Sequence, residues 1–137
     1  MRVFLDTNLL VSAVATRGLC ADVLREILVS HQLVVSASLI AELKNILHTK
    51  IEIPQDIISD FVEVLTEDSI LSENTKLTNI DINDEDDILI LSSALNGNVE
   101  LFVTGDKELL ELGTVQSMRI LSPREFWETL KTQVSNE

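Results

Sequence analysis

The chain opens with VFLDTN at residues 3–8, where three apolar residues are followed directly by an acid, Asp6. The same pattern returns in LFVTGD at residues 101–106, which ends in Asp106. A short, wholly apolar run followed by a polar residue is typical of a strand that is buried on both faces of a parallel sheet. Residues 33–35 form a third run of this kind, and residues 118–121 a weaker fourth. These runs predict the strands of one parallel sheet.

Segments with helical spacing lie between the predicted strands. Apolar residues recur at intervals of three and four across residues 23–28, 39–47, 57–65 and 88–95, as expected for helices that bury one face. Strands that alternate with helices are joined by right-handed crossovers, so we expect a three-layer α/β/α sandwich with a mainly parallel sheet of four to five strands. Such sheets bind ligands outside the carboxyl ends of their strands, which is where Asp6 and Asp106 should lie.

The length and composition of the chain fit a single domain. It has 137 residues and an apolar content of 45%, enough for one hydrophobic core. We assign residues 1–132 to this domain and residues 133–137 to a short polar tail.

Cys20 is the only cysteine, which fits a reducing, cytoplasmic setting. Asp6 interrupts the first apolar run too early for a signal peptide, and no run of about 18 apolar residues occurs, so no membrane association is expected.

The charge of the chain is strongly negative, because 23 acidic residues face 10 basic ones and give a formal net charge of -13. This balance argues against a protein that holds nucleic acid on a broad basic surface, since affinity for phosphates comes largely from Lys and Arg. It leaves open an enzyme that approaches phosphates through bound metal. The charge also suits a basic protein partner, and the apolar helices with few aromatic residues suggest a homodimer.

Four acids lie at positions that the solubility of the protein does not explain. Two of them follow strands, and a third lies at the edge of a helix. Asp6 and Asp106 end apolar strands, and the alternative role for both is to cap the helix that follows. Glu42 falls at the border of the apolar stripe of segment 39–47 on a helical wheel, so it can reach a cleft without entering the core. The alternative for Glu42 is a solvated helix edge.

The acidic run at residues 81–87 supplies the fourth candidate. Carboxylates at a helix N-terminus are favoured by the exposed amides and the macrodipole, which explains most of the run. Asp87, however, falls in the middle of the apolar stripe, whereas Glu85 faces water. We therefore select Asp87, with Asp84 or Asp86 as a neighbouring auxiliary ligand. Carboxylates gathered without Lys or Arg repel one another, and a divalent cation held by oxygen ligands relieves this repulsion.

These motifs match a known family in order and spacing. FLDTN at residues 4–8, AEL at residues 41–43, D-x-D-D at residues 84–87 and VTGD at residues 103–106 resemble the PIN-domain nucleases. The ending ILSPREFWETL at residues 120–130 looks like the close of the PIN subfamily of toxins from prokaryotic toxin-antitoxin systems. The similarity spans nearly the whole chain.

The resemblance implies a Mg²⁺- or Mn²⁺-dependent endoribonuclease that hydrolyses single-stranded RNA through metal-activated water. It also implies a small antitoxin protein with a basic segment as partner, and supporting roles for Asn8 and Thr104. Hard cations prefer carboxylate oxygens and can polarise a scissile phosphate, so the chemistry agrees with the family. The implied catalytic residues and metal ligands are Asp6, Glu42, Asp87 and Asp106.

Two other functions are weighed against this one. A phosphatase of the haloacid-dehalogenase type also begins with a strand and an Asp nucleophile, but it needs a second Asp two residues on, where this chain has Asn8. A non-catalytic PIN-like module that keeps the fold for protein interaction would be expected to lack one of the four acids. None of them is missing from the chain.

Overall fold

The computed structural model describes residues 1–72 and 78–135 as an alternation of strands and helices. The strands are β1 (Arg2–Leu5), β2 (Gln32–Ser36), β3 (Ile70–Ser72), β4 (Leu101–Val103), β5 (Thr114–Val115) and β6 (Met118–Leu121). The helices are α1 (Thr7–Ala15), α2 (Leu19–Ser30), α3 (Ala37–Thr49), α4 (Gln55–Glu67), α5 (Glu85–Asn96), α6 (Lys107–Leu112) and α7 (Pro123–Ser135). Every strand and helical segment predicted from the sequence is present. Helix α7 runs on through residues 133–135, which the sequence assigned to a tail.

The strands form one sheet in the order β3-β2-β1-β4-β6-β5. All neighbouring strands are parallel except β5 and β6, which confirms the mainly parallel α/β prediction. The sheet has six strands rather than four to five, because β3 and β5 lack the apolar pattern. β3 is an edge strand whose central Leu71 is 63% exposed, and β5 has only two residues. Neither strand is buried on both faces.

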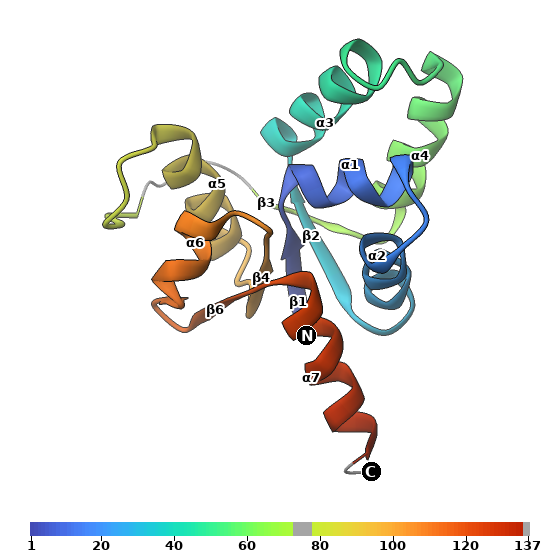
Figure 1. The fold of residues 1–137 in the computed structure, drawn as a ribbon. Coiled ribbons are helices and arrows are strands. Elements are labelled where there is room, and N and C mark those ends of the chain that lie inside the picture. Colours follow the sequence, from blue (N-terminus) through green and yellow to red (C-terminus); the bar gives the residue numbers. More distant parts are fainter. Residues whose placement is uncertain (73–77, 136–137) are drawn as a thin grey trace.

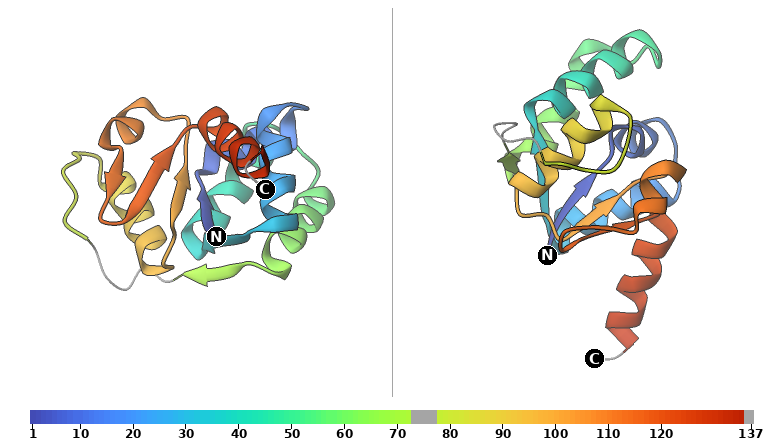
Figure 2. Two further views of the ribbon diagram at one scale, coloured as in Figure 1. Left: turned by 90° about the horizontal axis from the view of Figure 1, so that it is seen from below. Right: turned by 90° about the vertical axis from the view of Figure 1, so that its left-hand side faces the viewer.

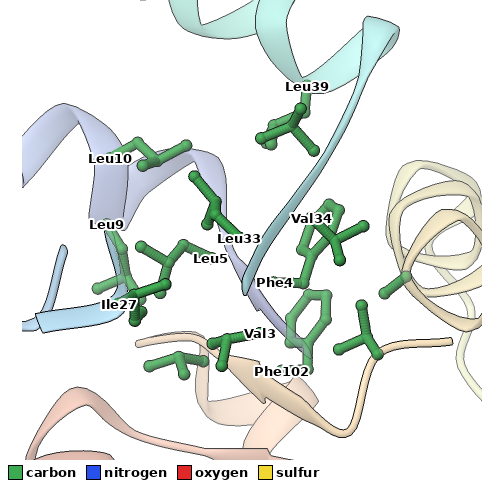
Figure 3. Packing of buried hydrophobic residues seen from close by; sticks show 14 of the residues in the cluster. Val3, Phe4, Leu5, Leu9, Leu10, Ile27, Leu33, Val34, Leu39 and Phe102 are labelled. Carbon is green, nitrogen blue, oxygen red and sulfur yellow. The ribbon is translucent and has the colours of Figure 1, made fainter. Parts of the chain in front are cut away.

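Successive residues of β1 point to opposite faces of the sheet, and each face is covered by helices. Figure 3 shows Leu5 on the side of Leu9 and Ile27, which belong to α1 and α2. Phe4 points to the other side, where its ring stacks on that of Phe102 at a centroid distance of 5.3 Å. Both faces of the central strands therefore carry hydrophobic core.

Helix α5 covers the face to which Phe4 points. Val34 is the register partner of Phe4 on β2, and a Cβ placed on Gly97 at the end of α5 would lie 2.7 Å from Val34 Cγ1. Only glycine allows so close an approach. In Figure 1 the strands lie between one group of helices, α1 to α4, and a second group, α5 and α6. This arrangement confirms the three-layer sandwich.

Helix α7 follows the last sheet strand and extends away from the body of the protein in Figures 1 and 2. Phe126 in its first turns is fully buried, and its ring lies 6.0 Å from that of His31. Trp127 beside it is half-buried, so this pair anchors the helix to the core. Within the described residues no single helix is long and apolar enough to cross a membrane, and α1 with α2 reaches that length only across a bend of 107°.

Candidate active site

Strands β1 and β4 lie side by side at the centre of the sheet, and each is followed by predicted site residues. The Asp6 amide donates a hydrogen bond to the Val103 carbonyl at 3.1 Å, which holds the two strand ends together. From this point the chain leads to β2 on one side and to β6 on the other, the position at which open α/β sheets form their ligand crevices. A hollow of about 340 Å³ lies there, lined by Asp6, Asn8, Leu9, Ser12, Gly105 and Asp106.

Asp6 is the N-cap residue of α1, but its carboxylate makes no capping hydrogen bond of normal geometry to that helix, although the amides of Thr7 and Asn8 lie close enough to act on it. Its Oδ2 instead accepts a hydrogen bond from the Thr104 hydroxyl at 2.7 Å. Burial raises the pKa of the Asp6 carboxyl above its ordinary value. Thr104 and the amides of Thr7 and Asn8 act in the opposite direction, while the charge of Asp106 adds to the increase. Asp6 is thus a held, half-buried carboxyl group at the strand end.

Thr104 is the residue that links the two strand ends, and it is fully buried. Besides donating to Asp6, its Oγ1 accepts a hydrogen bond from the Asp106 amide at 3.0 Å. One hydroxyl therefore fixes the carboxylate after β1 and the backbone after β4. The supporting role that the family resemblance implies for Thr104 in a metal site stays a prediction.

Asp106 does act as a helix cap, so the alternative reading from the sequence is right for this residue. Its Oδ1 accepts hydrogen bonds from the amides of Glu108 at 2.9 Å and Leu109 at 3.4 Å, at the start of α6. Asp106 nevertheless lines the same hollow as Asp6, and its charge raises the pKa of both Asp6 and Asp87. Capping and membership of the acidic site are compatible.

Asp87 reaches this region from the first turn of α5. It is half-buried, and burial raises the pKa of its carboxyl to about 6. The charges of Asp84, Asp106, Asp6 and Glu108 contribute further, in that order. Among the described residues, every charged group that acts on Asp87 is another carboxylate. Asp87 is thus less exposed than Glu85, as the helical wheel predicted, and its membership of the site stays a prediction.

The two candidate auxiliary ligands near Asp87 differ in position. Asp84 is the N-cap of α5, and its Oδ1 accepts from the amides of Asp86 at 2.9 Å and Asp87 at 3.3 Å. Asp86 is exposed and instead lies beside Glu42 of α3, with which it lines a second hollow. Of the two, Asp84 organises the helix start and Asp86 extends the acidic region toward α3.

Glu42 is exposed at the edge of α3, as the helical wheel predicted. Partial burial of its carboxyl raises its pKa, and the charges of Asp6 and Asp86 raise it further. The Thr7 hydroxyl and Lys50 act in the opposite direction. Glu42 thus connects electrostatically to the Asp6 side of the site and to Asp86.

The four predicted ligands are brought into electrostatic range of one another but not into one coordination sphere. Within the described residues, no three Asp, Glu, His or Cys side chains lie close enough together to hold a metal ion. Their role as ligands therefore stays a prediction. The donor set still fits a hard cation, because such ions prefer carboxylate oxygens and Mg²⁺ uses only one or two carboxylates while keeping several waters.

The buried hydroxyl of Thr7 has incomplete hydrogen bonding. Its Oγ1 is inaccessible to solvent and makes no hydrogen bond of normal geometry within the described residues, although it comes near enough to Glu42 to lower the pKa of that carboxyl. A buried polar atom with incomplete hydrogen bonding is costly unless another polar group completes its bonding. For the Thr7 hydroxyl, Glu42 is the polar group nearest to doing so.

Sequence reasoning missed three residues of this site: Thr7, Ser12 and Gly105. Ser12 follows Asn8 by four positions on α1, so the shared helix face could have indicated it. Gly105 stands beside the candidate Asp106, in the loop that the VTGD motif marks. No pattern in the chain shows that the Thr7 hydroxyl is unpaired.

Comparison with known proteins agrees with this arrangement. A sequence model of the PIN domain matches residues 2–108, the part of the chain that contains all the predicted site residues. The chain belongs to the PIN domain family. Members of this family are generally nucleases, and they generally use divalent metal ions. A search of curated proteins gives no match.

A solved PIN-like structure shares the fold. It is the crystal structure of VapBC2 from Rickettsia felis bound to a DNA fragment from their promoter. The match has a TM-score of 0.62, with 15% sequence identity, and covers 89% of this chain and 98% of the other. At 15% identity the match establishes the fold of this chain. It says nothing about the substrate of this chain.

Proposed function

We propose that this PIN-domain protein is a Mg²⁺- or Mn²⁺-dependent endoribonuclease that hydrolyses single-stranded RNA by means of activated water. One observation carries the proposal: among the described residues, the charged groups that act on Asp6 and Asp87 are all carboxylates. In addition, neither Asp6, Glu42, Asp87 nor Asp106 takes part in a salt bridge with a described residue. Acids that are held together without a basic partner are the expected signature of a cation site.

In such a site each of these residues has a separate role. Thr104 holds the Asp6 carboxylate through its hydrogen bond at 2.7 Å, so one acid is oriented before any ligand arrives. Asp87 and Asp106 add negative charge from α5 and from the loop after β4, and Asn8 and Ser12 line the adjoining hollow with groups that can bind phosphate or ribose. When bound, a divalent cation supplies the positive charge that lets a phosphodiester enter this region and lowers the pKa of the attacking water.

We further propose that the protein is the toxin of a cytoplasmic toxin-antitoxin pair and that it forms a homodimer. The family membership supports this, and VapBC2, which has the same fold, was solved as a complex. The net charge of -13 favours association with a basic segment of a small antitoxin, because opposite charges steer encounter and suppress wrong partners. Binding of such a segment near the acids would compete with the cation.

A cleavage assay tests the nuclease proposal. Asp6→Asn keeps the shape of the side chain and its contact with Thr104 but removes the charge, so we expect cleavage of a labelled single-stranded RNA in Mg²⁺ or Mn²⁺ to fall by about a hundredfold or more. Glu85→Gln is the matched control, since Glu85 is an exposed acid on α5 and should leave the rate unchanged. A calorimetric titration with Mn²⁺ alone measures the cation site without RNA. Undiminished cleavage by Asp6→Asn, or equal cleavage in chelator, would contradict the proposal.

A further inference from the structure

A second hollow lies between the first turns of α3 and α5, next to the acidic region. It has a volume of about 210 Å³ and is lined by Ser38, Leu39, Glu42, Asp86, Leu89 and Ile90. Each helix contributes an aliphatic residue and a carboxylate three positions apart, which places both on one helix face. The hollow therefore has aliphatic walls and a rim that accepts hydrogen bonds.

Leu89 is the unusual member of this lining, because it is a large aliphatic residue whose side chain is 40% exposed. Leu39 on the opposite wall is buried, with 1% exposed, and Ile90 is half-buried. A ligand that covers an exposed aliphatic side chain removes apolar area from water, and this burial stabilises the complex. The walls thus favour an apolar, flat group.

The size of the hollow limits what can enter it. Sites for drug-sized ligands have volumes of about 300–1,000 Å³, so about 210 Å³ suits a single ring system, with the rest of a larger ligand outside the hollow. When ionised, the two carboxylates at the rim can only accept hydrogen bonds. A ring that carries N–H donors therefore fits them. A nucleobase with an exocyclic amine has both properties, since its faces are apolar and its edge donates.

We propose that this hollow binds one unpaired base of the nucleic-acid strand beside the cleaved phosphate, and that Asp86 selects a base with an exocyclic amine. Asp86 is suited to this role because its side chain is exposed and lines this hollow, whereas it does not line the hollow at Asp6. Carboxylates accept hydrogen bonds from the N4 amine of cytosine in known nucleic-acid recognition. Cytosine and uracil have the same ring size, but uracil has no amine, so we expect cytosine to be preferred.

The inference rests on the proposed nuclease function, because it takes the acidic region as the place of the phosphate. Continuity supports this link: Glu42 lines the hollow and also senses the charge of Asp6. A strand whose phosphate lies near Asp6 would bring its neighbouring base toward α3 and α5. Base pairing would hide the edge that Asp86 contacts, so the hollow selects unpaired strands.

Nucleoside binding tests the hollow separately from catalysis. The probes are cytidine and uridine, which lack the phosphate that the acids would repel, added in chelator at up to tens of millimolar to methyl-labelled protein. None of the described residues that line the hollow is aromatic, so the stacking that strengthens many base sites is missing and weak binding is expected. We expect NMR shifts of the methyl groups of Leu39, Leu89 and Ile90, with cytidine binding about fivefold tighter than uridine, as one added hydrogen bond predicts.

Substitutions assign the preference to particular side chains. Asp86→Asn should abolish the preference for cytidine, because an amide offers a donor as well as an acceptor, whereas Glu85→Gln should retain it. Leu89→Ala should weaken both nucleosides. Its control is Leu28→Ala, since Leu28 has the same 40% exposure on α2 and does not line the hollow. Equal shifts for both nucleosides, shifts at other methyl groups, or an unchanged preference in Asp86→Asn would overturn the inference.

Cleavage mapping completes the test and separates the two proposals. Products from an RNA with a single variable position should show more cleavage next to cytidine than next to uridine, and Asp86→Asn should remove that difference. Cleavage that depends on Asp6 but shows no base preference would overturn the base site and leave the nuclease function standing. Selective cytidine binding without metal-dependent cleavage would overturn the nuclease function and leave the base site standing.

Discussion

Replacing Asp87 by Asn should stabilise the protein when no cation is present. The charge of Asp87 is opposed by burial and by four other acids, and the pKa of its carboxyl rises from 3.8 to about 6. The ionised form is therefore less favourable in the folded than in the unfolded protein. Asparagine has the same shape without the charge, so it removes this penalty at neutral pH.

The magnitude follows from the shift in pKa. A change of roughly two pKa units corresponds to about 3 kcal/mol, and because Asp87 is partly exposed, screening by solvent reduces this to about 1 to 2 kcal/mol. For a chain of 137 residues this raises the melting temperature by about 3 to 7 °C. The direction with pH is fixed: since the folded-state pKa is raised, the carboxyl group lowers stability as pH rises from 3.8 through about 6. The gain in Asp87→Asn should therefore be full at pH 7.5 and absent below pH 3.8.

Thermal and urea unfolding in chelator measure the effect, with Glu85→Gln as control. Both substitutions remove one acid from the first turn of α5 and so lose a similar favourable interaction with the helix dipole, about 0.3–1 kcal/mol. Only Asp87 faces the other acids. In millimolar Mg²⁺ or Mn²⁺ the order should reverse, because a cation that binds only the folded wild type stabilises it by mass action. If Asp87→Asn is no more stable than Glu85→Gln in chelator at pH 7.5, the acids do not meet as described.

Two further results are expected. Thr104→Val removes the donor to Asp6 and the acceptor for the Asp106 amide, so it should destabilise the fold by about 1–3 kcal/mol and raise the pKa of Asp6; urea unfolding and a carbon-13 NMR titration of the carboxyl groups measure both, and an unmoved Asp6 titration would show that the hydroxyl does not hold this acid. The homodimer should give twice the mass of 15.3 kDa by light scattering at micromolar concentration, and a strict monomer throughout that range would exclude it.

The central strands were predictable from the sequence, but the edge of the sheet was not. β1, β2 and β4 are buried on both faces, and a strand in that position must be apolar throughout, which leaves a clear pattern. The edge strand β3 exposes Leu71, and β5 pairs through only two residues. Strands of this kind are defined by their hydrogen-bonded neighbours, which lie far away in the sequence.

The site was predictable in outline, because its acids break local patterns of burial. The helical wheel separated Asp87 from Glu85 and placed Glu42 at a border, and the structure agrees with both positions. The sequence could not decide which acids cap a helix: Asp6 and Asp106 follow strands in the same way, yet only the Asp106 side chain makes capping hydrogen bonds of normal geometry. The Asp6 carboxylate instead accepts a hydrogen bond from Thr104, which follows the neighbouring strand β4.

The hydrogen bond between Thr104 and Asp6 joins positions that are 98 residues apart, and this separation has a consequence during synthesis. At about 5–20 residues per second, the ribosome needs roughly 5 to 20 seconds to proceed from Asp6 to Thr104. In that time the nascent chain carries Asp6 and then Glu42, but neither β4 nor Asp106, so strand β1 lacks one of its two neighbours and the acids have not gathered. The pairing of Asp6 with Thr104 therefore forms late, when most of the chain has already been made.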